Sequence, residues 1–294
     1  MTPFPPALRP AVAPRSGRRR GLSLGAGLAL LVAGAALVPV PAAAQAYLRN
    51  CLEAKGASAT LADQCRRALD GGGLSARQQA GAWVNIGVAL SEMGRDGDAL
   101  AAFDRGVAAD PNFGAGFINR ALARARRGDT GGALDDWGRA IALAPGAAEP
   151  LVGRATLQLQ RGQAAAALGD LDRAVRVAPQ DPDAHYNRGL ALSALGRGRE
   201  AAEAFGRVLR IDPNDAAAHL QRGVALLTLD PSAALRDLDA ALRISPNWAA
   251  AWATRGQAQE KLGRTEAASA DYRRAFELGY QAPWLNRKIE ALGG

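Results

Sequence analysis

The two histidines of the chain are the first candidates for chemistry, because imidazole can bind a metal ion or act as a general base near neutral pH. His185 and His219 stand 34 residues apart. They occupy one position of an internal repeat, described below, at which Trp83 and Trp252 stand in other copies. A position that accepts histidine and tryptophan alike indicates packing. We therefore expect no metal site and no catalytic histidine.

The two cysteines are the next candidates. Cys51 and Cys65 are 14 residues apart, which matches no common zinc-binding pattern, and neither stands beside a histidine. In an oxidising compartment two such residues form a structural disulfide. The alternative is a pair of buried free thiols. We expect the disulfide.

A glycine-rich segment, GRGR at residues 196–199, superficially resembles a phosphate-binding loop. Such loops follow a β-strand, and no strand is predicted before this one. No nucleophile elbow is present, and no paired carboxylates combine with a distinct pocket. The sequence thus predicts no catalytic residue and no cofactor, and we expect the protein not to be an enzyme.

The charge distribution argues against nucleic-acid binding. The formal net charge is +8, but residues 1–46 hold five arginines and no acidic residue. Without them 31 basic side chains face 28 acidic ones, and arginines alternate with aspartates throughout. Nucleic-acid binders concentrate basic residues on one face. We expect no nucleic-acid partner.

The first 46 residues are predicted to be a signal peptide. Three arginines at 18–20 precede an uncharged apolar run at 21–38, and small residues at 42–46 offer cleavage sites. Cleavage would leave a periplasmic or secreted protein of bacterial type. The alternative is an uncleaved inner-membrane anchor facing the periplasm, because the run approaches the roughly 20 residues that span a bilayer. Only in that case do we expect a membrane contact.

The elements that position all these residues come from an internal repeat. Its period is 34 residues, in six blocks that begin near residues 80, 114, 148, 182, 216 and 249, and the fifth is one residue short near Pro231. Each block has a large residue at position four, a small one at eight, alanine at twenty and a large one at twenty-four. The residues expected to pack in this way include Trp83, Gly87, Ala99, Phe103, Ala133, Trp137, Ala167, Gly189, Ala201, Phe205, Gly223, Trp252, Gly256, Ala268 and Tyr272.

This pattern, which ends in proline in five blocks, resembles the tetratricopeptide repeat (TPR) family over about 200 residues. The resemblance implies an all-α solenoid of six helix hairpins at 80–281. We expect an N-terminal capping helix pair at 47–79, which carries both cysteines, and a C-terminal capping helix at 282–294. The expected function is non-catalytic binding of a protein or peptide partner.

In the family the sixth position of a block commonly faces the concave groove. Here it holds mostly amides, namely Asn85, Asn119, Asn187 and Gln221, with Gly153 and Thr254 in the other blocks. Amides can satisfy the backbone of an extended peptide, although they are also well tolerated as solvated residues. Tyr186 could add an aromatic contact. No lysine stands at the fifth position, which argues against the family's carboxylate clamp.

A second column holds arginine at the seventh position of blocks two to six, paired in four of them with aspartate at the twenty-third. The predicted inter-helix ion pairs are Arg120 with Asp136, Arg154 with Asp170, Arg222 with Asp237, and Arg255 with Asp271. Arg188 meets Ala204 instead, so we expect it to reach a ligand. The alternative makes all five arginines a basic ladder for an acidic partner.

Together these features predict a scaffold or adaptor in the bacterial periplasm that binds proteins or peptides in its groove. The competing prediction is an inner-membrane-anchored assembly factor for an envelope or secretion complex. The sequence names no partner.

Overall fold

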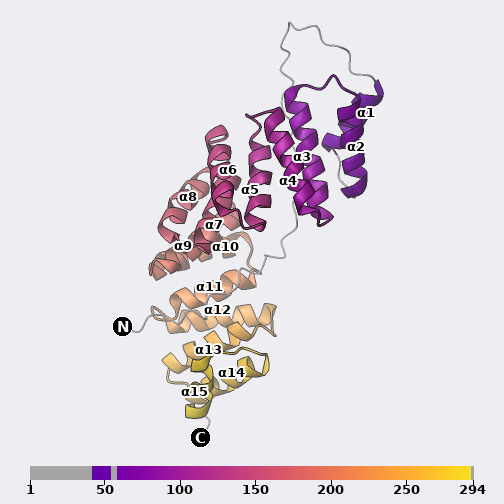
Figure 1. The fold of residues 1–294 in the computed structure, drawn as a ribbon. Helices are drawn as coiled ribbons and strands as arrows, with labels where there is room; N and C mark the ends of the chain where they lie inside the picture. Colours follow the sequence, from indigo (N-terminus) through magenta and orange to yellow (C-terminus); the bar gives the residue numbers. More distant parts are fainter. Residues whose placement is uncertain (1–41, 54–57, 293–294) are drawn as a thin grey trace. The chain divides into compact units, whose positions relative to one another are not determined.

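The computed structural model describes residues 42–53 and 58–292, and the regular secondary structure of these residues is all α-helical (Figure 1). An N-terminal helix pair comprises α1 (Ala42–Glu53) and α2 (Ser58–Asp70). Six hairpins follow: α3 (Ala76–Glu92) with α4 (Asp96–Ala109), α5 (Gly114–Arg126) with α6 (Thr130–Leu143), α7 (Glu149–Gln160) with α8 (Ala164–Val177), α9 (Pro182–Ala194) with α10 (Gly198–Ile211), α11 (Ala216–Leu226) with α12 (Pro231–Ile244), and α13 (Ala249–Lys261) with α14 (Thr265–Glu277). Helix α15 (Pro283–Leu292) ends the described chain.

The helices form two compact units, with α7 running across their boundary between residues 157 and 158. In the N-terminal unit the helices α1 to α6 pack against one another in chain order. The first helices of the first two hairpins, α3 and α5, are also in contact. In the C-terminal unit α8 to α15 pack in the same sequential order, and α11 contacts both α9 and α13. Within each unit the predicted stacking of hairpins in chain order is therefore present.

The predicted small-and-large packing explains why these hairpins close tightly. A Cβ atom added to Gly189 would lie 2.6 Å from the ring of Phe205, and one added to Gly256 would lie 2.5 Å from the ring of Tyr272. Both rings are fully buried. The glycine on the first helix thus makes the space that the aromatic residue of the second helix fills. Ala99, Ala133, Ala167, Ala201 and Ala268 are likewise fully buried on the second helices.

Trp83 and Trp252 are less enclosed than a core assignment implies, since both are only partly buried. The guanidinium carbon of Arg105 lies 4.7 Å from the centre of the Trp83 ring, and that of Arg255 lies 4.4 Å from the Trp252 ring. These distances are typical of cation–π contacts. The two tryptophans thus pack on one face and are covered by an arginine on the other.

Three rings at this same fourth position share a polar contact. Trp252 Nε1 donates to the carbonyl of Pro246 at 2.7 Å, and the Nε2 atoms of His185 and His219 lie 2.9 and 3.0 Å from the carbonyls of Pro179 and Pro213. Each acceptor is the proline that ends the preceding repeat. The histidines therefore take the structural place of tryptophan, as the repeat pattern predicted.

The first hairpin begins earlier than the predicted boundary at residue 80. Ser75 Oγ accepts a hydrogen bond from the Gln78 backbone N–H, and the Gln78 side chain accepts one from the Ser75 N–H. This reciprocal capping box starts helix α3 at Ala76. In five of the six repeats a glycine with positive φ stands between the two helices, for example at 74° in Gly94 and 73° in Gly196, where only glycine is unstrained.

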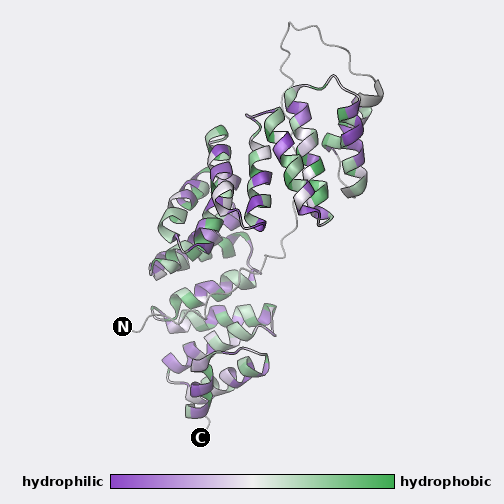
Figure 2. Ribbon diagram, in the orientation of Figure 1, coloured by the Kyte–Doolittle hydropathy of each residue, from purple (hydrophilic) through white to green (hydrophobic). Residues whose placement is uncertain are grey.

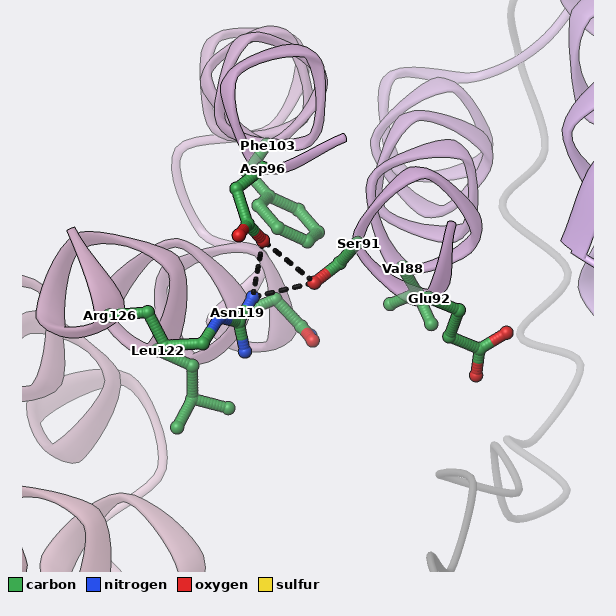
Figure 3. Close-up of a pocket in the computed structure, with 8 residues that line it drawn as sticks. All are labelled: Val88, Ser91, Glu92, Asp96, Phe103, Asn119, Leu122 and Arg126. Atoms are coloured by element: carbon green, nitrogen blue, oxygen red, sulfur yellow. Dashed lines mark hydrogen bonds and ion pairs between the residues drawn. The ribbon is translucent and has the colours of Figure 1, made fainter. Parts of the chain in front are cut away.

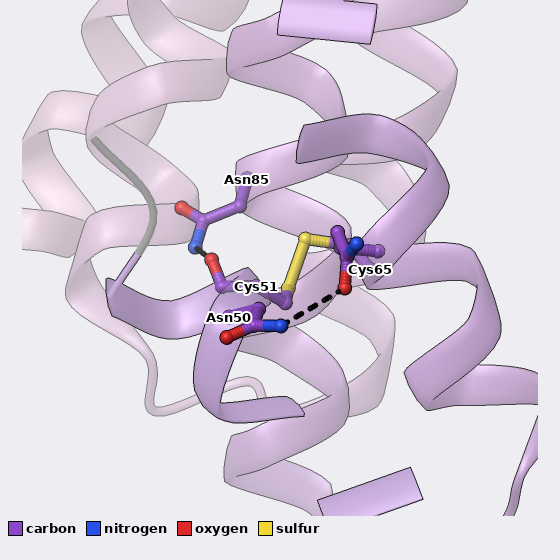
Figure 4. Close-up of a disulfide and its surroundings, with 5 residues drawn as sticks. Asn50, Cys51, Cys65 and Asn85 are labelled. Atoms are coloured by element: carbon purple, nitrogen blue, oxygen red, sulfur yellow. Dashed lines mark hydrogen bonds between the residues drawn. A yellow bond between two sulfur atoms is a disulfide. The ribbon is translucent and has the colours of Figure 1, made fainter. Parts of the chain in front are cut away.

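The predicted disulfide is confirmed and joins α1 to α2 (Figure 4). Cys51 and Cys65 have Cα atoms 4.8 Å apart, and both side chains are fully buried. They belong to the same core cluster as Val84 and Ile86 of α3. The side-chain amide of Asn85 donates to the Cys51 carbonyl at 2.9 Å. The α1–α2 pair is therefore tied covalently within itself and packed onto the first hairpin.

Removing this disulfide should destabilise the α1–α2 pair. For the variant Cys51→Ala/Cys65→Ala we expect a loss of about 3 kcal/mol, because a short closed loop of this size restricts the unfolded chain by about that much. Amide hydrogen exchange should accelerate in α1 and α2 and change little in α13 and α14. Wild-type protein treated with a reductant is the control and should behave like the variant. Unchanged protection in α1 and α2 would show that the disulfide contributes nothing to their stability.

The C-terminal helix α15 covers the last repeat. Leu285 is fully buried against Tyr272, and Lys288 forms an ion pair with Glu260 of α13. The Tyr272 hydroxyl donates to the other oxygen of Glu260 at 2.8 Å. Burial, together with this bond to an anion, raises the pKa of Tyr272 far above its ordinary value. Helix α15 thus covers the last repeat, as expected of a C-terminal cap, through both apolar and polar contacts.

Hydrophilic and hydrophobic residues alternate along the helices (Figure 2). Among the described residues no helix has the length and apolar character needed to cross a bilayer. The predicted signal peptide at 1–46 lies outside the described residues except for 42–46, where α1 begins.

Candidate functional site

A cleft of about 450 Å³ opens in the N-terminal unit between its first two repeats (Figure 3). Helix α3 contributes Val88, Ser91 and Glu92, helix α4 contributes Asp96 and Phe103, and helix α5 contributes Asn119, Leu122 and Arg126. The cleft forms because the first helices α3 and α5 lie side by side and the second helix α4 packs behind them. Its lining combines aliphatic, aromatic, amide and charged groups.

The apolar part of the cleft has a buried base and an open wall. Phe103 is 2% exposed and is the same ring that fills the space beside Gly87. Leu122 is 41% exposed and lines the open side of the cleft, so its apolar surface is accessible to a partner. An apolar side chain of a partner could cover Leu122 and rest above Phe103.

The polar part of the cleft joins successive repeats. Arg126 Nη2 donates to Ser91 Oγ at 2.6 Å and lies 3.7 Å from Asp96 Oδ1. Ser91 Oγ in turn lies 3.4 Å from the same carboxylate oxygen. About half of the Arg126 side chain is exposed, so solvent screens the ion pair and its charge remains available to a bound group.

Asn119 is the one predicted groove amide that lines this cleft. Its Nδ2 donates to the Ala115 carbonyl of the preceding helical turn at 2.8 Å. That bond fixes the side chain and uses one of its two N–H groups, so that one N–H and the carbonyl oxygen are left for a ligand.

The other predicted groove residues are placed less uniformly. Asn187 Nδ2 donates to the Asp183 carbonyl at 2.9 Å, as Asn119 does to Ala115, whereas Asn85 is bonded to Cys51. Gln221 is 9% exposed and is thus nearly inaccessible. Tyr186 packs edge-on against Phe205 with ring centres 5.5 Å apart. Asn85 does not line the cleft with Asn119, and Asn187, Gln221 and Tyr186 belong to the C-terminal unit, so a continuous amide ladder remains a prediction.

The predicted ion pairs form as bidentate contacts in three repeats. Asp136 accepts from Arg120 at 2.7 and 2.9 Å, and Asp271 accepts from Arg255 at 2.7 and 2.8 Å. Asp237 is bound in the same way by Arg222 at 2.6 and 2.7 Å. The three aspartates are buried. Hydrogen bonding to its aspartate raises the pKa of each arginine above its ordinary value, although burial opposes the shift.

The pair of Arg154 with Asp170 stays a prediction, because the two residues belong to different units. The premise that Arg188 lacks a partner was wrong, and its contact with a ligand stays a prediction. Arg188 Nε donates to Asp172 Oδ1 at 2.7 Å. Asp172 lies on the second helix of the preceding repeat, so the arginine that lacks a partner within its own hairpin finds one in the hairpin before it.

This second set of aspartates was missed by the sequence reasoning. Asp104 binds Arg120 at 3.0 Å and Asp239 binds Arg255 at 2.9 Å, each from the repeat before the arginine. In every case the aspartate precedes its arginine by 16 residues. Arg120 and Arg255 therefore each bind one aspartate on the second helix of their own repeat and another on the second helix of the preceding repeat. These arginines hold the repeats together, which favours the structural interpretation over a basic ladder.

Across residues 42–53 and 58–292, no group of three or more His, Cys, Asp or Glu side chains is arranged to hold a metal ion. What the site offers is a concave surface with an apolar base, one cation, carboxylates and an amide. Such a surface suits recognition of an extended peptide.

Stacked antiparallel hairpins with small-and-large packing define the chain as a helical repeat solenoid. Sequence profiles described as "Tetratricopeptide repeat" match residues 84–148, 152–216, 188–230 and 249–278, which together exceed half of the chain. The chain belongs to the tetratricopeptide repeat family. Proteins of this family are generally non-catalytic scaffolds that bind protein or peptide partners.

Solved structures show the same fold. Pseudomonas aeruginosa pilF is similar with a TM-score of 0.64 and 16% identity over 73% of this chain and 98% of its own. YrrB, described as a TPR protein with an unusual peptide-binding site, has a TM-score of 0.51 and 24% identity over 58% of this chain and 88% of its own. A chain of the APC/C hetero-tetramer Cut9–Hcn1 has a TM-score of 0.60 and 18% identity over 72% of this chain, which spans only 42% of that one. No curated protein sequence matches this chain.

Proposed function

We propose that the protein is a non-catalytic scaffold that binds an extended peptide segment of a partner protein in the cleft between α3, α4 and α5. The observation that carries this proposal is the half-exposed Leu122 beside the fixed amide of Asn119 and the exposed cation of Arg126. An apolar side chain of the peptide would cover Leu122. Its backbone would meet Asn119, and a polar or acidic neighbour would meet Arg126.

A peptide selection followed by titration tests this assignment. Peptides selected from a random displayed library on the purified chain are labelled, and their binding is followed by fluorescence anisotropy. Leu122→Asp should weaken binding at least about tenfold, because it places a charge where apolar surface would be buried. Leu229→Asp is the matched control, since Leu229 is 50% exposed on the turn between α11 and α12. Equal affinity of wild type and Leu122→Asp would refute the proposed site.

The proposed location is the bacterial periplasm. The Cys51–Cys65 disulfide supports an oxidising compartment, and the signal-like pattern of residues 1–46 supports export. The second candidate is an inner-membrane-anchored assembly factor that keeps the apolar run at 21–38. Sequencing the N-terminus of the protein recovered from cells separates the two. A start at Gln45 or Tyr47 would eliminate the anchored form, whereas an intact N-terminus would eliminate the cleaved one.

A further inference from the structure

The second helices of three successive repeats in the C-terminal unit carry a surplus of exposed positive charge. Helices α8, α10 and α12 contain seven arginines and no lysine: Arg173, Arg176, Arg199, Arg207, Arg210, Arg236 and Arg243. None of the seven makes an ion pair with another described residue. All but the partly buried Arg173 are exposed. Their charges therefore point into solvent.

The acidic residues of these helices do not neutralise that charge, because nearly all of them are committed elsewhere. Asp172, Glu200, Asp237 and Asp239 accept hydrogen bonds from arginines outside the three helices, namely Arg188, Arg197, Arg222 and Arg255. Asp170 is buried. Among the acidic residues of α8, α10 and α12, Glu203 is the exposed residue that has no arginine partner in the described part of the chain. Because the first four of these carboxylates are paired with arginines outside the three helices, the unpaired exposed charge of α8, α10 and α12 is mainly positive.

Exposed aliphatic residues accompany the arginines at the same end of each helix. On α10, Arg207, Arg210 and Ile211 are spaced so that they share one helix face. The same spacing recurs on α8 with Arg173, Arg176 and Val177. Helix α12 has only the last two residues of this pattern, Arg243 and Ile244. Val177, Ile211 and Ile244 are 36–42% exposed. The eight residues occupy equivalent positions of three successive repeats and are called the basic–aliphatic face below.

We propose that the basic–aliphatic face docks on the anionic phospholipid surface of a membrane. Arginine stems lie along apolar surface while their guanidinium groups stay at the level of the phosphates. The three aliphatic side chains would then enter the boundary between headgroups and acyl chains. This combination of basic and apolar residues on one face is what shallow membrane binding requires.

A bilayer fits this face better than an acidic peptide does. The side chains project from the exposed sides of second helices, whereas a bound peptide needs a concave surface such as the cleft at α3, α4 and α5. Charge alone would also not account for an aliphatic residue directly after arginine at the end of all three helices. The proposed peptide site and the membrane face lie on different elements, so each can be tested without the other.

Vesicle sedimentation with the full chain tests the proposal. The vesicles contain phosphatidylcholine alone or with about one third phosphatidylglycerol. The variant Arg207→Gln/Arg210→Gln/Arg243→Gln removes three charges from the face. Arg127→Gln/Arg161→Gln/Arg264→Gln removes three exposed arginines elsewhere and is the charge-matched control. All proteins keep residues 1–46, so any binding by that segment is common to them.

We expect wild type and the control to bind the anionic vesicles alike and the face variant to bind them about 100-fold more weakly, with the difference lost at high salt. Ile211→Ser/Ile244→Ser should weaken binding to vesicles but leave binding to soluble polyglutamate unchanged. Equal vesicle binding by wild type and the face variant would overturn the proposal. So would an unchanged vesicle affinity of the serine variant, which would instead indicate an acidic protein as partner.

Discussion

Asp136→Ala is expected to destabilise the protein by about 3 kcal/mol. The Asp136 carboxylate is 3% exposed and accepts hydrogen bonds from Arg120 and Arg124, the latter at 2.8 Å. Its removal leaves two partly buried guanidinium groups without their main acceptor. Asp104 still binds Arg120, which keeps the loss at the lower end of the range for a broken buried ion pair.

Urea denaturation followed by circular dichroism measures this loss. Asp135→Ala is the matched control, because Asp135 is the neighbouring residue, is exposed and has no ion pair with a described residue. It should change the free energy of unfolding by less than about 0.5 kcal/mol. If the two alanine variants were equally stable, the arginine–aspartate pairs would not stabilise the fold. The column of arginines would then be better explained as a basic ladder that binds an acidic partner.

Phe205→Ala should cost about 3–5 kcal/mol, because the ring is fully buried and lies in the space that Gly189 leaves open. Phe276→Ala is the control at the same residue type. Phe276 is 51% exposed on α14, so its truncation should have little effect on thermal or urea denaturation.

A double-mutant cycle sharpens the same prediction. Gly189→Ala alone should destabilise, because its Cβ would lie 2.6 Å from the Phe205 ring. In a Phe205→Ala background the added methyl group enters vacated space and should cost much less. The cycle should therefore give a coupling energy of about 1 kcal/mol or more. Strict additivity would contradict the small-and-large packing on which the hairpins depend.

The elements that the sequence predicted well are those whose cause is local. Gly189 and Phe205 lie in one hairpin, and their spacing recurs in five of the six blocks, so the packing could be inferred from the repeat pattern. The same holds for Arg120 with Asp136, which stand on the two helices of one hairpin. The disulfide followed from the compartment and the spacing of Cys51 and Cys65.

The features that were missed depend on contacts between hairpins. Asp104, Asp172 and Asp239 occur in alternate blocks, with Gly138 and Gly206 between them, so no continuous column marks them. Their partner is the arginine of the next hairpin, which only the stacking geometry brings near. For this reason the sequence shows no partner for Arg188, although the side chain is bonded to Asp172.

The cleft could not be inferred from the sequence for a related reason. Its walls come from α3, α4 and α5, and its shape depends on how Leu122 and Arg126 project once α5 is seated on the first hairpin. The resemblance to the family implied only that Asn119 faces the groove. The partly buried Trp83 shows the converse case, in which a large residue at a packing position stays partly accessible beneath Arg105.

The central claim is that the chain acts by holding a partner peptide in this cleft. Site-specific photocrosslinking in living cells tests this claim most directly. A photoreactive phenylalanine replaces either Leu122 in the cleft or Ala101, which is exposed on the second helix α4. The account predicts discrete crosslinked adducts from position 122, with the crosslink mapped to one peptide segment of the partner, and none from position 101. Equal adducts from both positions, or adducts from position 101 alone, would contradict it.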